Sequence, residues 1–203
     1  MKDITIILDN GHGENTGGKR SPLFDDGKTR LYEWEFNRDV VKRICKLLDK
    51  EGIRYIVLVP ETTDISLAER VRRCNAYCGK LGTKNCLLVS VHSNAASSDG
   101  KWHNAGGFSV YVANNASKES KDFAGTIYGE AEKLDLKGNR SVPKERYWQA
   151  GFYIIRNSKC PAVLTENLFY DNKREAEWLM TDEGRETIAE MHAEAIKRYL
   201  SES

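Results

Sequence analysis

The sequence lacks several features that would assign a protein class at once. Its 203 residues contain no apolar run long enough to span a membrane, and the apolar stretch in the N-terminal "MKDITIILDN" is too short for a signal peptide. We therefore expect a chain synthesised in the cytoplasm without a signal peptide or a membrane segment. The formal net charge is only +1, so the charge balance gives no indication of a nucleic-acid partner.

Cysteine is present but does not form an even set. The five cysteines predict free, mostly buried thiols and not a disulfide framework. Cys74 and Cys78 are four residues apart on a predicted helix, a spacing that can bind a metal ion, but no second close pair follows nearby. We interpret these two side chains as small apolar groups on the core face of that helix.

Six short runs of aliphatic and β-branched residues predict strands, mostly as continuous apolar stretches, which favours burial on both faces of a sheet. The runs are Ile4–Leu8, Tyr55–Val59, Cys86–Val91, Phe108–Val112, Phe152–Ile155 and Ala162–Thr165. Helical patterns alternate with them. We therefore predict an α/β fold: a single domain over residues 1–203, with a twisted, mostly parallel sheet of about six strands and helices on both faces.

Four helical segments are expected. Apolar spacing predicts a helix over residues 36–50, and Ser66 with Glu69 forms a capping-box pattern that opens the second. The second helix would bury Leu67, Val71, Cys74 and Cys78. The third would start near Ser117 and bury Phe123, Ile127 and Ala131. The last would run over Lys173–Leu200 with a break near Thr181–Gly184, and its inner face would carry Ile188, Met191, Ala195 and Tyr199. Two long loops, Asn10–Trp34 and Lys137–Gly151, suit the rim of a substrate groove.

Titratable side chains gather where predicted strands end. Asp9 and His12 follow the first strand, His92 follows the third and Glu166 the last, while Glu33 and Glu35 precede the first helix. Ligands bind beyond the carboxyl ends of parallel strands, and two histidines with a carboxylate satisfy the ligand needs of catalytic zinc. From their spacing alone, metal binding and ordinary hydrogen bonding at a strand end are about equally favoured as the role of these two histidines. The other histidines, His103 and His192, are predicted to be surface residues, and Gly11 and Gly13 to allow a sharp turn around His12.

A series of motifs is more specific than these residues alone. In chain order they are "LDNGHG", E-x-x-x-N at Glu33–Asn37, "SLAERVRRCN" at Ser66–Asn75, "SVHSN" at Ser90–Asn94, GG-x-S-V-Y at Gly106–Tyr111 and "PAVLTENLF" at Pro161–Phe169. The series resembles the zinc-dependent N-acetylmuramoyl-L-alanine amidases of the amidase-3 family, from Ile4 to about Leu200. One departure is Leu168, where the family often has glycine.

The resemblance implies a peptidoglycan hydrolase that cleaves the amide between the lactyl group of N-acetylmuramic acid and L-alanine of the stem peptide. By motif, His12, Glu33 and His92 would hold one Zn²⁺, and Glu166 would be the general base toward zinc-activated water. Glu33 is preferred to Glu35 because it stands four residues before Asn37.

Further residues are assigned supporting roles, and other functions stay open. The supporting residues are Asp9, which would orient His12; Arg156, which would bind a substrate carboxylate or the oxyanion; and Asn94 and Glu35 as further residues near the site.

The alternative functions are a zinc peptidase or deacetylase acting on another amide, and a non-catalytic cell-wall-binding domain. An endolysin released by a membrane pore, or an autolysin whose leader has been removed, would fit the predicted N-terminus.

Overall fold

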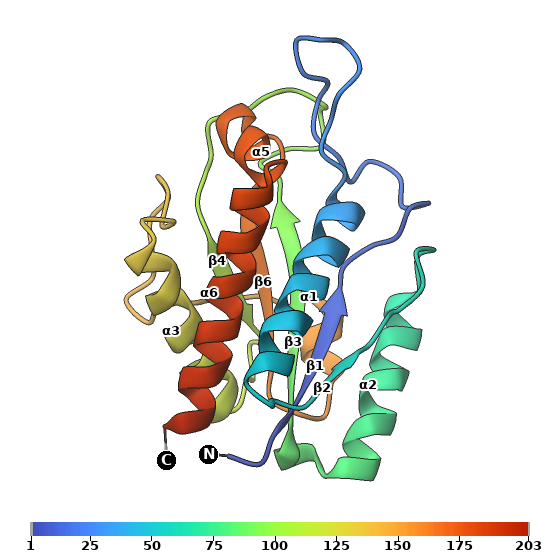
Figure 1. Ribbon diagram of the computed structural model, residues 1–203, viewed down its shortest axis with the longest axis vertical. Helices are drawn as coiled ribbons and strands as arrows, with labels where there is room; N and C mark the ends of the chain where they lie inside the picture. Colours follow the sequence, from blue (N-terminus) through green and yellow to red (C-terminus); the bar gives the residue numbers. More distant parts are fainter. Residues whose placement is uncertain (1, 203) are drawn as a thin grey trace.

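A computed structural model describes residues 2–202 and shows one six-stranded sheet with the strand order β2-β1-β3-β6-β4-β5 (Figure 1). The strands are β1 (Thr5–Asn10), β2 (Tyr55–Val57), β3 (Cys86–Asn94), β4 (Ser109–Val112), β5 (Trp148–Gln149) and β6 (Ala162–Phe169). The strands β2, β1, β3 and β6 are parallel, whereas β4 is antiparallel to β6 and parallel to β5. The predicted single-domain α/β fold with a mostly parallel sheet is confirmed; residues 1 and 203 of the predicted range lie outside the described part.

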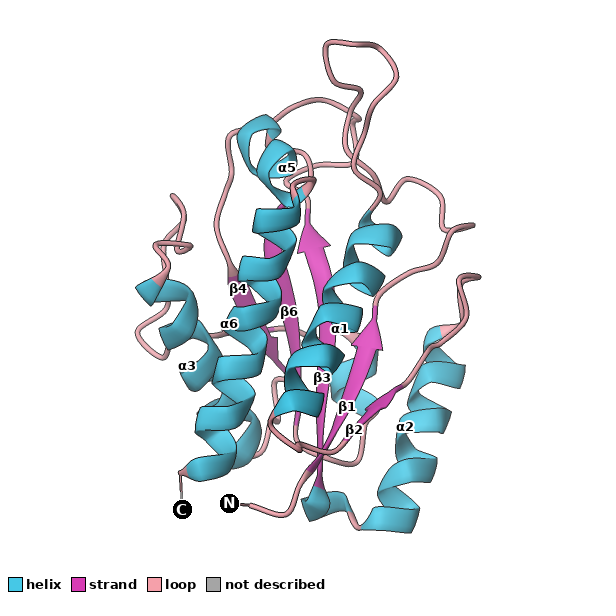
Figure 2. Cartoon of the chain, viewed as in Figure 1, coloured by secondary structure: helices cyan, strands magenta, loops and turns pink. Residues whose placement is uncertain are grey.

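Helices cover both faces of this sheet (Figure 2). They are α1 (Glu33–Lys50), α2 (Leu67–Leu81), α3 (Lys118–Lys133), α4 (Tyr153–Asn157), α5 (Lys173–Leu179) and α6 (Asp182–Ser201), with a short 3-10 turn at Thr83–Asn85. Ile6 and Leu8 of β1 point into the core formed with α1, α3 and α6, while Ile7 points into the core formed with α2 and α4. This double burial explains why β1 is apolar at consecutive positions. None of the helices within residues 2–202 has the length and apolarity needed to cross a membrane.

The helix ends follow their capping residues. Ser66 Oγ accepts the Glu69 N–H at 3.3 Å, and Ser117 Oγ accepts the Ser120 N–H at 3.3 Å, as predicted. The expected break in the last helical region is also present, because Thr181 Oγ1 accepts the Gly184 N–H at 2.9 Å and starts α6 anew. The reciprocal half of the capping box is not made: the Glu69 carboxylate pairs with arginines of its own helix.

Two predictions, one about a strand and one about a buried leucine, are wrong. Phe152–Ile155 forms no strand, because Phe152 is the N-cap residue of α4 and residues 153–155 are its first turn; the remaining strand is instead β5, Trp148–Gln149, which pairs with β4. A short apolar run fits a helix turn as well as a strand, and here the adjacent Ile154 and Ile155 are buried while Phe152 is exposed. Leu67 is 53% exposed because α2 begins there, before its inner face meets the sheet.

His192 is fully buried in α6 and is not a surface residue. Its Nδ1 donates to the Ile188 carbonyl oxygen at 2.8 Å, and its Nε2 accepts from Thr165 Oγ1 at 3.0 Å. Both ring nitrogens are therefore paired without a charge, which makes burial of the neutral imidazole possible. Burial lowers the pKa of His192 to about 4.

Candidate metal centre

Three side chains converge at the carboxyl edge of the sheet. His12 follows β1, His92 lies near the end of β3, and Glu33 is the first residue of α1. Glu33 Oε1 stands 3.0 Å from His92 Nδ1, and Glu33 Oε2 stands 3.3 Å from His12 Nε2. One potential ligand atom from each residue lies within 4.8 Å of the others, so the three could hold one ion.

The glycines flanking His12 serve close packing and not a special backbone conformation. A Cβ on Gly11 would fall 2.0 Å from His92 Cε1, and one on Gly13 would fall 2.1 Å from the backbone nitrogen of Asp64. It is His12 itself that adopts the left-handed conformation, with φ of 62°. The prediction that the glycines make the turn is therefore corrected: they allow a ring and a neighbouring loop to approach it.

A buried ion pair supports the turn that carries His12. Arg70 Nη1 donates to Asp9 Oδ1 at 2.6 Å and to the Asn10 carbonyl oxygen at 2.8 Å, and Nη2 donates to the His12 carbonyl oxygen at 2.9 Å. The other Asp9 oxygen accepts from Ser90 Oγ at 2.6 Å. Asp9 therefore contacts Arg70 and Ser90 and not the His12 ring, so its effect on His12 passes through Arg70, contrary to the expectation of direct contact.

The E-x-x-x-N motif places two functional groups on one face of α1. While Glu33 reaches the histidines, Asn37 lies one turn later and its Nδ2 donates to the Gly11 carbonyl oxygen at 3.1 Å. Glu35 points elsewhere: its side chain is 52% exposed and lies 3.5 Å from Arg185 Nη1. The geometry distinguishes Glu33 from Glu35, as the motif does.

Electrostatics around Glu33 favour its charged form. Burial by itself would raise the pKa of Glu33, but hydrogen bonds from His12 and then His92 hold that pKa well below its ordinary value. The Ser93 N–H also donates to Glu33 Oε1 at 3.2 Å. A carboxylate kept ionised beside two imidazoles is the form in which such groups bind a metal.

Glu166 is half-buried on β6, directly opposite His92 of β3, with Ser109 of β4 on its other side. Its Oε2 is buried and has no hydrogen-bond partner within residues 2–202. Burial raises the pKa of Glu166 to about 7, with opposing effects from the charges of His92 and Glu33. This carboxyl group is thus poised to take and release a proton near neutral pH.

The chain after Glu166 is irregular. Leu168 is buried and has φ of 62°, and the pairing of β3 with β6 shifts between His92 and Asn94. Asn167 Nδ2 donates to the His92 carbonyl oxygen at 2.8 Å across this irregularity. A left-handed backbone explains why glycine would be accepted where this chain has Leu168. Asn94 Oδ1 accepts the N–H of Ala95 at 2.9 Å, a local role at the strand end.

Arg156 lies away from the candidate site, contrary to expectation, whereas Arg140 lies beside it. Arg156 is an exposed residue of α4 and borders a hollow of about 710 Å³ at the opposite edge, near the first residues of β1 and β6. No motif marks Arg140 in the sequence, because it is a lone arginine in a long loop. Its Nη2 donates to Ser109 Oγ at 2.7 Å, and its guanidinium lies 4.9 Å from the centre of the Phe169 ring, which places it beside Glu166.

The donor set fits zinc better than a hard cation. Two imidazole nitrogens and one carboxylate oxygen are typical of catalytic zinc, which uses three protein ligands and leaves one position open. Glu33 Oε2 is buried and makes no well-aligned hydrogen bond within residues 2–202, although His12 Nε2 lies 3.3 Å away, so this oxygen remains free for an ion. His103, by contrast, pairs with Asp99 in a separate loop.

Comparisons with known proteins agree with the motifs. The family model described as N-acetylmuramoyl-L-alanine amidase matches residues 6–198. The endolysin of Bacillus phage SPP1 is 33% identical over 206 residues, covering 97% of this chain and 66% of the relative. The probable cell wall amidase LytH of Staphylococcus saprophyticus is 25% identical over 202 residues, covering 100% of this chain and 60% of the relative. The chain thus spans about two thirds or less of the length of these curated relatives.

Solved structures share the fold over the whole chain. The N-acetylmuramoyl-L-alanine amidase from Clostridium difficile 630 superposes with a TM-score of 0.80 at 25% identity, covering 100% of both chains. The catalytic domain of CwlV, an N-acetylmuramoyl-L-alanine amidase from Bacillus (Paenibacillus) polymyxa, superposes with a TM-score of 0.75 at 22% identity, covering 98% of this chain and 99% of that one. The second likeness concerns the fold alone.

Proposed function

Because this chain belongs to the N-acetylmuramoyl-L-alanine amidase family, we propose that it hydrolyses the amide between the lactyl group of N-acetylmuramic acid and L-alanine in peptidoglycan. The observation that carries the proposal is the position of Glu33 between His12 and His92, with Glu166 on the neighbouring strand. The proposed partner is the peptidoglycan of the cell wall, which is where the protein would act.

His12, Glu33 and His92 would hold the ion. A zinc ion held there would supply Lewis-acid chemistry that polarises the amide carbonyl. The protein's own contribution is orientation: Arg70 and Asn37 hold the carbonyl oxygens around the His12 turn, and Asn167 holds that of His92. Fixed ligands of this kind keep the site in a productive geometry.

Glu166 would move the proton. Its carboxylate takes a proton from the attacking water and later delivers it to the departing alanine nitrogen, which leaves as an amine. A pKa raised to about 7 by burial suits both steps, because the group gains and loses a proton at similar cost. The positive charges of Lys19 and Arg140 also act on Glu166 and favour its ionised form, in which it can take a proton.

Mass spectrometry of digested sacculi tests the cleaved bond. The expected products are peptides with a free N-terminal alanine and glycan strands that keep the lactyl group. Released acetate would instead indicate a deacetylase, a cut within the stem peptide would indicate a peptidase, and binding without products would indicate a wall-binding domain. Each of these outcomes would contradict the proposed function.

A further inference from the structure

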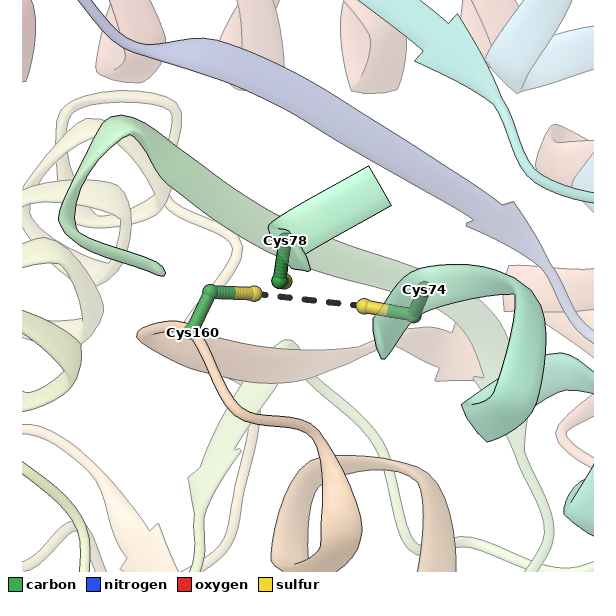
Figure 3. Close-up of side chains that lie close together, drawn as sticks. All are labelled: Cys74, Cys78 and Cys160. Carbon is green, nitrogen blue, oxygen red and sulfur yellow. Dashed lines mark hydrogen bonds between the residues drawn. The ribbon is translucent and has the colours of Figure 1, made fainter. Parts of the chain in front are cut away.

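A second cluster of possible metal ligands lies away from the histidines, on the face of the sheet that α2 and α4 cover. Cys74 and Cys78 face inward from α2, and Cys160 lies on the segment between α4 and β6 (Figure 3). All three are buried free thiols, and their sulfur atoms lie within 4.8 Å of one another. The Sγ atoms of Cys74 and Cys160 are 3.9 Å apart.

We propose that Cys74, Cys78 and Cys160 bind a structural Zn²⁺ ion through their thiolates. Zn–S bonds of about 2.3 Å put the sulfurs of a tetrahedral site about 3.8 Å apart, close to the separation of Cys74 and Cys160. The remaining sulfur pairs lie within 4.8 Å, so each separation would have to shorten by about 1 Å or less to reach that spacing. Cys86, the first residue of β3, is buried in the same apolar cluster but is not one of the three sulfurs that meet within 4.8 Å.

The surroundings favour a soft cation over other occupants. The cluster is enclosed by aliphatic side chains such as Ile7, Val71 and Ile154, with which the cysteines share one buried core. Such surroundings offer few oxygen ligands, whereas thiolates select zinc and other soft ions. Each thiol releases its proton to solvent when the ion binds, so the affinity of the site for zinc increases as pH rises.

The ion would stabilise two segments that support the histidine site. It joins α2 to the segment that leads into β6, which carries Glu166. Cys74 also lies one helical turn after Arg70, the residue that holds the carbonyl oxygens of Asn10 and His12. The thiolate site would therefore fix the helix on which the His12 turn depends.

Cobalt binding to the reduced, metal-free protein tests the site by a readout that is independent of amidase activity. Thiolate ligands give Co²⁺ a strong near-ultraviolet charge-transfer band, which histidine and glutamate do not. We expect this band in the intact chain and in a variant with His12→Ala and His92→Ala. After loading with Zn²⁺, the intact chain should hold about two ions and the double variant about one.

A matched pair of cysteine variants completes the test. Cys160→Ala should abolish the cobalt band and lower the zinc content by about one ion, whereas Cys45→Ala should change neither. The two cysteines are similarly buried, 6% and 8% exposed, so the packing loss is comparable. Absence of the band in the folded, reduced chain would overturn the proposal. A Cys74–Cys160 disulfide in the protein as purified, detected as a mass lower by two hydrogens, would also overturn it.

Discussion

The backbone of Gly11 lies so close to the His92 ring that a methyl group on Gly11 would stand 2.0 Å from His92 Cε1. A side chain at this position would push the ring away from Glu33 and His12. Gly11→Ala should therefore lower zinc affinity by about tenfold or more, since overpacking typically costs about 1–3 kcal/mol. Gly17→Ala is the control, because within residues 2–202 no atom beyond its two chain neighbours lies within 4 Å of the added Cβ. Zinc titrations of the two variants decide the point, and equal affinities would contradict it.

Glu166→Gln should abolish hydrolysis while zinc stays bound. The substitution keeps the shape of the side chain but removes the group that takes the proton, and such groups contribute about 10²–10⁴-fold in rate. Release of alanine-terminated peptides and zinc content are measured on the same preparation. Activity within a few-fold of the unmodified protein would exclude the assigned role.

Replacing Glu33 and Glu35 separately by alanine tests which one is the ligand. Only Glu33→Ala should reduce zinc affinity, because Glu33 is buried between His12 and His92 whereas Glu35 is exposed beside Arg185. Isothermal titration with zinc provides the measurement. A larger loss for Glu35→Ala would reverse the assignment.

Arg70→Met should destabilise the fold strongly. It leaves the Asp9 carboxylate buried without its ion-pair partner, and breaking a buried pair costs about 3–5 kcal/mol. Arg72→Met is the matched control on the same helix, because its ion pair with Glu69 is exposed and worth about 0–1 kcal/mol. Urea unfolding measures both, and similar losses would show that Arg70 has no special role.

The free energy of unfolding should fall in mild acid because of His192. Its folded pKa of about 4 lies below the ordinary value of 6.5, so the unfolded chain binds the additional proton between these values. Stability from this group is therefore present near neutral pH and falls by about 2 kcal/mol between about pH 7 and about pH 5. His192→Gln should show a shallower decline. Parallel curves for the two proteins would contradict the prediction.

Much of the fold follows from local patterns. Continuous apolar runs identified five of the six strands, and Ser66 and Ser117 marked helix starts that the structure reproduces. Both signals are short-range, since strand burial and capping depend on residues within a few positions. The strand predicted at Phe152–Ile155 is wrong because this segment is too short for strand and helix periods to differ.

Charged and polar partners were harder to predict than apolar elements. Asp9 was expected against His12 but pairs with Arg70, 61 residues away, and His192 was expected at the surface but pairs with Thr165. A hydrogen-bonded partner is chosen by proximity in space, and a polar side chain in a helix does not reveal whether such a partner exists. Arg140 is a similar case, placed beside Glu166 only by the strand pairing of β4 with β6.

The sequence by itself determined the alternation of strands and helices and the motif series containing His12, Glu33, His92 and Glu166, because these depend on residue type and order along the chain. Only the tertiary structure decided that Glu33 stands between the two imidazoles, that Gly11 makes room for the His92 ring, and that three cysteines meet on the opposite face. Those contacts join residues far apart in the chain, and the strand order and helix packing bring them together.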